Sequence, residues 1–219
     1  MRVIKIKLPK LLLCSCLCIL PAVSFALTEE QLLSLLETQN VEAIQAGGAE
    51  VMSTLVKLYQ KSDNSRRTKI AAIFYGLSWK SEEAKRVLMS DVKTENESLR
   101  LQVQWALGRV SNDDQVVAQL LENMRNDPNP LFRDKAACAL ANDQIHLTER
   151  QKVKLYEGVI SALGDDKQDV RRIAGLVMQI QTGQSKNYNP SASPEERVKS
   201  IAAWTAWLNQ YKLAVRDEK

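Results

Sequence analysis

Residues 129–140, Asn-Pro-Leu-Phe-Arg-Asp-Lys-Ala-Ala-Cys-Ala-Leu, place an arginine after a proline-containing turn and put small or apolar residues three, six and seven positions later. The same pattern follows three other arginines, so that the four copies stand at Arg67, Arg100, Arg133 and Arg171. The intervals between them are 33, 33 and 38 residues. A period in this range is typical of stacked arrays, in which no single unit can bury its apolar face alone.

Apolar residues elsewhere recur at spacings of three and four, which indicates amphipathic helices, and we find no alternating Val/Ile/Thr-rich run. Capping residues and helix breakers predict helices over 28–36, 48–60, 63–79, 81–92, 95–110, 112–124, 130–142, 148–163, 166–181 and 194–214. A helical bundle would also contain such helices, but it needs no common interval between equivalent residues. We therefore predict an all-α fold, a short α-solenoid of about four to five stacked antiparallel helix pairs with terminal capping helices.

The turn–Arg–x–x–Ala–x–x–Ala–Leu pattern resembles the second helix of HEAT and HEAT-like repeats. The likeness is closest over 129–140 and 169–174 and covers roughly residues 63–183, although Arg66 replaces the apolar residue before the first arginine. The resemblance implies an α-solenoid in which the four arginines act as structural pins. The tail that carries Trp204 and Trp207 is similar to a block after the last repeat of many bacterial HEAT-repeat envelope proteins. We expect both tryptophans to cap the open end of the array, with ligand stacking as the alternative.

The chain divides into four predicted parts, which are a signal peptide, an N-terminal helical cap or degenerate repeat, the HEAT-like repeats, and a loop with a C-terminal capping helix. Their bounds are 1–26, 27–62, 63–183 and 184–219. The first part has a basic start, an apolar stretch over 11–22 and small residues before position 27, which is the pattern of a cleaved secretory signal. An uncleaved anchor is the alternative, but the apolar stretch is shorter than the roughly 20 residues that span a bilayer.

These features predict an exported protein, periplasmic or secreted, without a membrane span after cleavage. We do not favour a lipoprotein anchored through Cys16, because the apolar run before this cysteine is too short. Four of the 30 Lys and Arg residues and none of the 26 acids lie in residues 1–26, so the rest of the chain carries 26 of each. Binding of nucleic acid normally needs a clustered excess of basic residues, so we expect no nucleic-acid partner.

The residue inventory argues against catalysis. Cys138 is the single cysteine outside the signal peptide and His146 is the single histidine of the chain, which excludes a Cys2His2-type zinc site. We find no phosphate-binding glycine loop, no HExxH motif and no nucleophile with an assignable base, and we expect no cofactor and no metal. Cys138 is expected to be a small helix residue rather than a nucleophile.

A binding surface is the remaining candidate, because the second helices of solenoids commonly line the concave face. Positions one, five and eight after each arginine place Tyr75, Trp105, Asp134 and Arg172 on this strip. Aromatic residues often anchor protein partners, whereas the alternative is ordinary packing between adjacent helices. We predict a module for protein–protein interaction or assembly in a bacterial cell envelope. The alternative is an enzyme or enzyme subunit of the HEAT-like lyase type that holds a substrate on this face. The sequence specifies neither the partner nor the oligomeric state.

Overall fold

The computed structural model describes residues 27–217, all of whose regular elements are α-helices. The predicted signal peptide over 1–26, Cys16 included, and the last two residues lie outside the described part. The helices in chain order are α1 (Glu29–Thr38), α2 (Val41–Ala46), α3 (Val51–Lys61), α4 (Asn64–Leu77), α5 (Glu82–Asp91), α6 (Glu97–Val110), α7 (Asp114–Asn126), α8 (Pro130–Asn142), α9 (Glu149–Ala162), α10 (Gln168–Thr182) and α11 (Pro194–Asp217).

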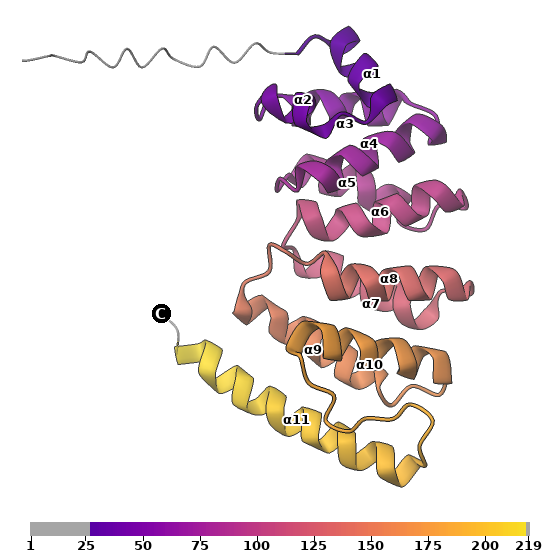
Figure 1. The fold of residues 1–219 in the computed structure, drawn as a ribbon, viewed down its shortest axis with the longest axis vertical. Helices are drawn as coiled ribbons and strands as arrows, with labels where there is room; N and C mark the ends of the chain where they lie inside the picture. Colours follow the sequence, from indigo (N-terminus) through magenta and orange to yellow (C-terminus); the bar gives the residue numbers. More distant parts are fainter. Residues whose placement is uncertain (1–26, 218–219) are drawn as a thin grey trace, which may run out of the picture.

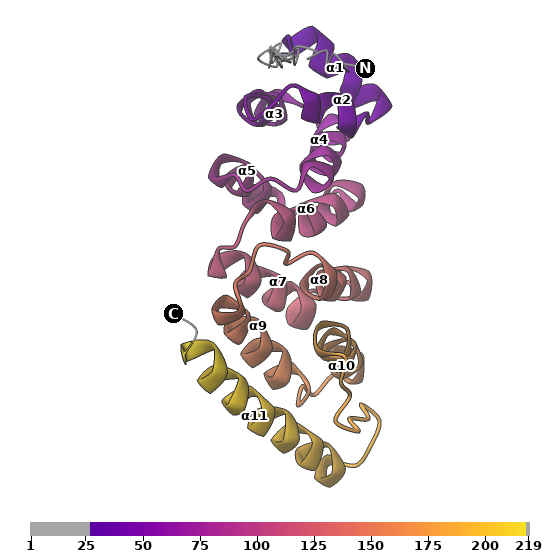
Figure 2. The same cartoon turned by 60° about the vertical axis from the view of Figure 1, so that its left-hand side comes forward.

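Four antiparallel pairs, α3/α4, α5/α6, α7/α8 and α9/α10, are stacked along the long axis of the molecule (Figure 1). The turned view in Figure 2 separates the first helices α3, α5, α7 and α9 from the second helices α4, α6, α8 and α10, which form a neighbouring column. Each second helix packs against the next one, α4 on α6, α6 on α8 and α8 on α10. The predicted α-solenoid is confirmed.

Helix ends follow the capping residues of the sequence. The Asn129 side chain accepts from the backbone N–H of Leu131 and Pro130 opens α8, so this helix has the predicted bounds. Thr28 begins α1 with a capping box, as predicted. The prediction missed the short helix α2, which Asn40 caps. The bounds of the predicted helices differ from those in the structure by at most three residues.

The stripe after each arginine forms the core. The residues three, six and seven positions later are at most 2 % exposed in all four copies, namely Ile70, Ile73 and Phe74, Val103, Ala106 and Leu107, Ala136, Ala139 and Leu140, and Ala174, Val177 and Met178. Burial of a Val, Leu, Ile, Phe or Met side chain stabilises a fold by about 1.5–3 kcal/mol. The repeat in the sequence is therefore a repeat of buried contacts.

Among the described residues, no helix is both long and apolar enough to cross a membrane.

Candidate functional site

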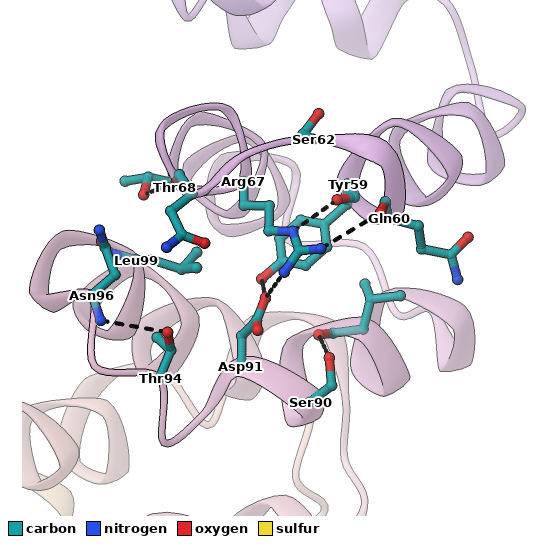
Figure 3. Close-up of polar contacts among 12 residues, drawn as sticks. Tyr59, Gln60, Ser62, Arg67, Thr68, Ser90, Asp91, Thr94, Asn96 and Leu99 are labelled. Atoms are coloured by element: carbon teal, nitrogen blue, oxygen red, sulfur yellow. Dashed lines mark hydrogen bonds and ion pairs between the residues drawn. The ribbon is translucent and has the colours of Figure 1, made fainter.

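The first three arginines of the repeat each bind an acid of the following unit. Arg67 donates from Nε to the carbonyl oxygen of Tyr59 (3.1 Å), near the end of α3. Its Nη1 lies 3.3 Å from a carboxylate oxygen of Asp91 in the next unit (Figure 3). The Tyr59 hydroxyl donates to the same carboxylate at 2.7 Å, and burial together with this contact raises the pKa of Tyr59. Arg67 and Tyr59 of one unit thus share the carboxylate of Asp91 in the next unit.

The next two arginines also bind an acid of the following unit. Arg100 forms an ion pair with Asp127, whose side chain is 1 % exposed, and its guanidinium lies 4.2 Å from the centre of the Phe132 ring. Arg133 donates to the carbonyl oxygen of Asp127 (2.7 Å) and, from Nε, to Asp169 (3.0 Å). In each of the three copies, the acid that binds the arginine belongs to the unit that follows.

Arg171 has no repeat after it, and it binds carbonyl oxygens instead. Its Nη1 lies 2.9 Å from the carbonyl oxygens of both Asp165 and Asp166 in the preceding turn. Its Nε donates to the carbonyl oxygen of Pro190 at 3.0 Å, in the loop that leads to α11. The last arginine therefore fastens the C-terminal segment in the place where the other three hold a further unit.

The surface of α4, α6, α8 and α10 that carries Tyr75, Trp105, Asp134 and Arg172, which we call the second-helix face, contains three adjoining hollows. The largest, of about 500 Å³, lies across α4, α6 and the end of α8. Its lining residues are Tyr75, Gln102, Trp105, Cys138, Asn142 and Asp143. Tyr75 and Trp105, which the sequence places 30 positions apart, thus open on one space.

A buried polar cluster fixes one wall of this hollow. The Arg109 guanidinium lies over the Tyr75 ring at 4.3 Å and donates to the hydroxyl of that tyrosine (3.1 Å) and to Asp143 (3.1 Å). Burial raises the pKa of the Asp143 carboxyl, while the hydrogen bond from Arg109 acts in the opposite direction. Because its ring and hydroxyl are both held, Tyr75 presents a fixed aromatic edge to the hollow.

The other two hollows continue along the same face. Asp134 lines the second, of about 70 Å³, together with the exposed side chains of Leu176 and Ile180. Arg172 lines the third, of about 180 Å³, beside Tyr188 and the loop after α10. Cys138 lines the first two hollows and Leu176 lines the last two, so the three form one continuous track. The four residues predicted for the strip all lie on it, in three separate hollows.

Sequence reasoning missed Gln102, Asn142, Asp143 and Ile180 as lining residues. Gln102 and Ile180 lie two and nine positions after their arginines, outside the positions assigned to the strip. Asn142 is the last residue of α8, nine positions after its arginine, and Asp143 is the C-cap beyond it. Helical spacing alone cannot locate a residue such as Asp143, which lies beyond the end of its helix.

The candidate chemical groups of the sequence serve the structure. Burial raises the pKa of the Cys138 thiol, which favours its neutral form. His146 Nε2 lies 2.9 Å from the carbonyl oxygen of Ser78 and 2.8 Å from that of Arg109; since both are acceptors, this nitrogen carries the hydrogen. No group of His, Cys, Asp and Glu side chains within residues 27–217 is arranged to hold a metal ion. The track thus offers aromatic, apolar, amide and charged surface for contact with a partner.

The tryptophans of the tail lie at the end of the array. Trp204 is 1 % exposed, and its ring meets that of Trp207 edge to face at 5.5 Å. Trp207 also lies edge to face with Tyr156 of α9 and stacks on Tyr211. The four rings form one cluster between α9 and α11, so the inner side of α11 is committed to packing.

Comparison with known proteins supports the repeat assignment. Residues 52–141 match the family model for HEAT repeats, which takes in α3 to α8 and the arginines Arg67, Arg100 and Arg133. No curated protein and no solved structure was found to match the chain. The match begins N-terminal to the expected range of 63–183 and ends before the fourth arginine, Arg171. Residues 52–141 are thus similar to HEAT repeats, and they lie within a short HEAT-like solenoid.

Proposed function

We propose that the protein is an exported, non-catalytic module that binds a protein segment along its second-helix face. HEAT repeats generally mediate protein–protein interaction. The observation that carries the proposal is the hollow of about 500 Å³ on which Tyr75 and Trp105 both open. Partly exposed aromatic side chains with fixed orientations are favoured anchors, because they provide a large contact area at a small cost in conformational entropy.

Site-specific photocrosslinking in cells that export the protein tests the location of binding. A photoreactive amino acid in place of Gln102, which lines the largest hollow together with Trp105, should give one dominant protein adduct, whereas the same group at Ala118 should give none. Ala118 is an exposed residue on the first helix α7 and serves as the matched control. Equal adducts from both positions, or none from position 102, would contradict the proposal.

The Trp105→Ala variant separates binding from packing. Trp105 also packs against the core, so its removal could act through stability alone. Truncation of a core tryptophan costs about 3–5 kcal/mol, which a thermal unfolding curve would show at once. We expect a smaller loss of stability together with loss of the adduct from a photoreactive group at the neighbouring Gln102. A folded variant that still gives the adduct would show that Trp105 does not anchor the partner.

Export is a separate part of the proposal and has its own test. The basic, apolar and small-residue regions of 1–26 support cleavage before Leu27. N-terminal sequencing of the protein recovered outside the cytoplasm should start at Leu27. Retention of the whole chain in the cytoplasm would overturn the assignment without affecting the binding site.

A further inference from the structure

The outer side of α11, at the end of the array in Figures 1 and 2, has an unusual composition for an exposed helix. Residues 200–211 contain no charged residue, although 26 % of the chain is charged. Val198 and Leu213 are 64 % and 55 % exposed, the highest values among the large exposed hydrophobic side chains of residues 27–217. Helical spacing puts one exposed stripe on this side, formed by Val198, Ala202, Thr205, Ala206, Asn209 and Leu213. We call it the outer stripe.

The opposite end of the array shows what an uncovered terminal helix looks like in this protein. The exposed residues of α1 include three acids and two further polar side chains, namely Glu29, Glu30, Gln31, Ser34 and Glu37. Terminal repeats need such a polar outer face to stay soluble. The N-terminal helix meets this requirement with charged side chains, whereas the exposed centre of α11 carries alanines and uncharged polar residues, which indicates that α11 is covered in the assembled protein.

We propose that α11 packs antiparallel on α11 of a second copy of the chain, around a two-fold axis between positions 205 and 206. In this register Val198 lies opposite Leu213 of the second copy, and Thr205 lies opposite Ala206. Ala202 lies opposite Asn209 in the same register. The stripe is therefore complementary to itself, as a two-fold interface requires. Large side chains meet at both ends, and the alanines between them allow the helix axes to approach to the short end of the usual 8–10 Å.

The charges at the two ends of α11 favour this orientation over a parallel one. Glu195 lies in the first turn of the helix, three residues before Val198, and Arg216 lies in the last turn, three residues after Leu213, so both continue the outer stripe. The proposed register sets Glu195 opposite Arg216 of the second copy, and antiparallel packing also opposes the two helix dipoles. A parallel pair would instead set Glu195 against Glu195 and Arg216 against Arg216. Charge complementarity at the ends of the stripe thus favours a second copy in the reverse direction.

The size of the outer stripe determines how strongly the two copies are expected to bind. Six residues from each copy form the centre, well below the roughly 20–30 residues a side of a standard stable interface. We therefore expect a reversible dimer that dissociates in the micromolar range, in addition to any binding on the second-helix face. The two faces are on different elements, so failure of one proposal leaves the other intact.

Sedimentation equilibrium of the full chain tests the assembly. Its average mass should rise from that of one chain towards that of two as concentration increases from about 1 to 500 µM, the range of a small, weak interface. Ala206→Arg should abolish this rise, whereas Ala118→Arg, a matched exposed alanine in the middle of α7, should leave it unchanged. Circular dichroism confirms that both variants are folded. A single-chain mass for the unmodified protein over the whole range would overturn the proposal.

Cysteine crosslinking tests the register even if one arginine variant fails to fold. In a background with all four cysteines replaced by serine, Ala206→Cys should crosslink to itself through a short bismaleimide. Val198→Cys alone should not, because the axis leaves two copies of residue 198 about 22 Å apart along the helix. A mixture of Val198→Cys and Leu213→Cys chains should crosslink. Self-crosslinking of Val198→Cys as efficiently as Ala206→Cys would overturn the antiparallel register.

Discussion

Replacement of Asp127 by asparagine should strongly destabilise the array, because it removes one charge of a buried pair. The Asp127 carboxylate binds Arg100 of the preceding unit, and the side chains are 1 % and 12 % exposed, respectively. Its Oδ1 also accepts a hydrogen bond from the backbone N–H of Asn129 (2.9 Å). Asparagine can keep that second bond, so the substitution isolates the charge.

The magnitude follows from this burial. Removal of one partner of a buried ion pair costs about 3–5 kcal/mol, because the other charge stays desolvated without a counterion. Arg100 retains its position over the Phe132 ring, which offsets part of the loss. We therefore expect Asp127→Asn to lower the free energy of unfolding by about 3 kcal/mol. At about 2–4 °C per kcal/mol for a chain of this size, the midpoint of thermal unfolding should fall by about 6–12 °C.

Asp169→Asn is the matched control in the next unit. The carboxylate of Asp169 binds Arg133 in the equivalent way, but its side chain is 41 % exposed. Partly exposed pairs contribute about 0–1 kcal/mol, so this variant should lose at most about 1 kcal/mol. Urea unfolding followed by circular dichroism at neutral pH measures both. Equal losses in the two variants, or a loss below about 1 kcal/mol for Asp127→Asn, would refute the claim that burial determines the strength of these contacts.

Two further predictions concern close packing and pH. Gly108→Ala should destabilise the protein by about 1–3 kcal/mol in a thermal melt, because its Cβ would lie 2.5 Å from the carbonyl oxygen of Asp143. Gly164→Ala, whose Cβ would meet no atom closer than 3.7 Å, should be neutral or slightly stabilising. The hydrogen bond from Arg133 lowers the pKa of Asp169 in the folded protein, whereas the pKa of an aspartate in the unfolded chain is near 3.9. The pair therefore stabilises the fold fully above that unfolded pKa, and its contribution is lost as pH falls through the lower pKa of the folded protein. The stability difference between the unmodified chain and Arg133→Gln should therefore narrow from pH 6 to pH 3 in urea titrations, and a constant difference would contradict this.

The repeat was predictable because its signal is periodic and local. The positions three, six and seven after each arginine are buried in all four copies, and a buried helix face needs this spacing whatever the partner helix contains. Helix starts were also predictable where one side chain makes the cap, as Asn129 does for α8. Helix α2 was missed because its six residues are too few for apolar spacing to show, and only Ile44 is buried.

The acids that bind the arginines could not be assigned from the sequence. The carboxylates come from the following unit, at Asp91, Asp127 and Asp169. The first two terminate a first helix and the third lies in the first turn of a second helix, so no common spacing connects them to their arginines. Such pairings depend on how units stack, which local patterns do not encode. The hollows of the second-helix face arise from the same stacking, so the sequence could not predict them for the same reason.

The longer third interval between the arginines changes how the units are coupled. Stability in solenoids is carried mainly by contacts between neighbouring units, and an insertion in a connection is usually inexpensive. Here the connection between α8 and α9 returns over the array, and His146 binds carbonyl oxygens at the ends of both α4 and α6. Arg109 adds contacts to Ser78 and Asp143 at the same place. These bonds link three successive units directly, so the segment that forms the largest hollow is held as one body, and a partner can bind there without first ordering it.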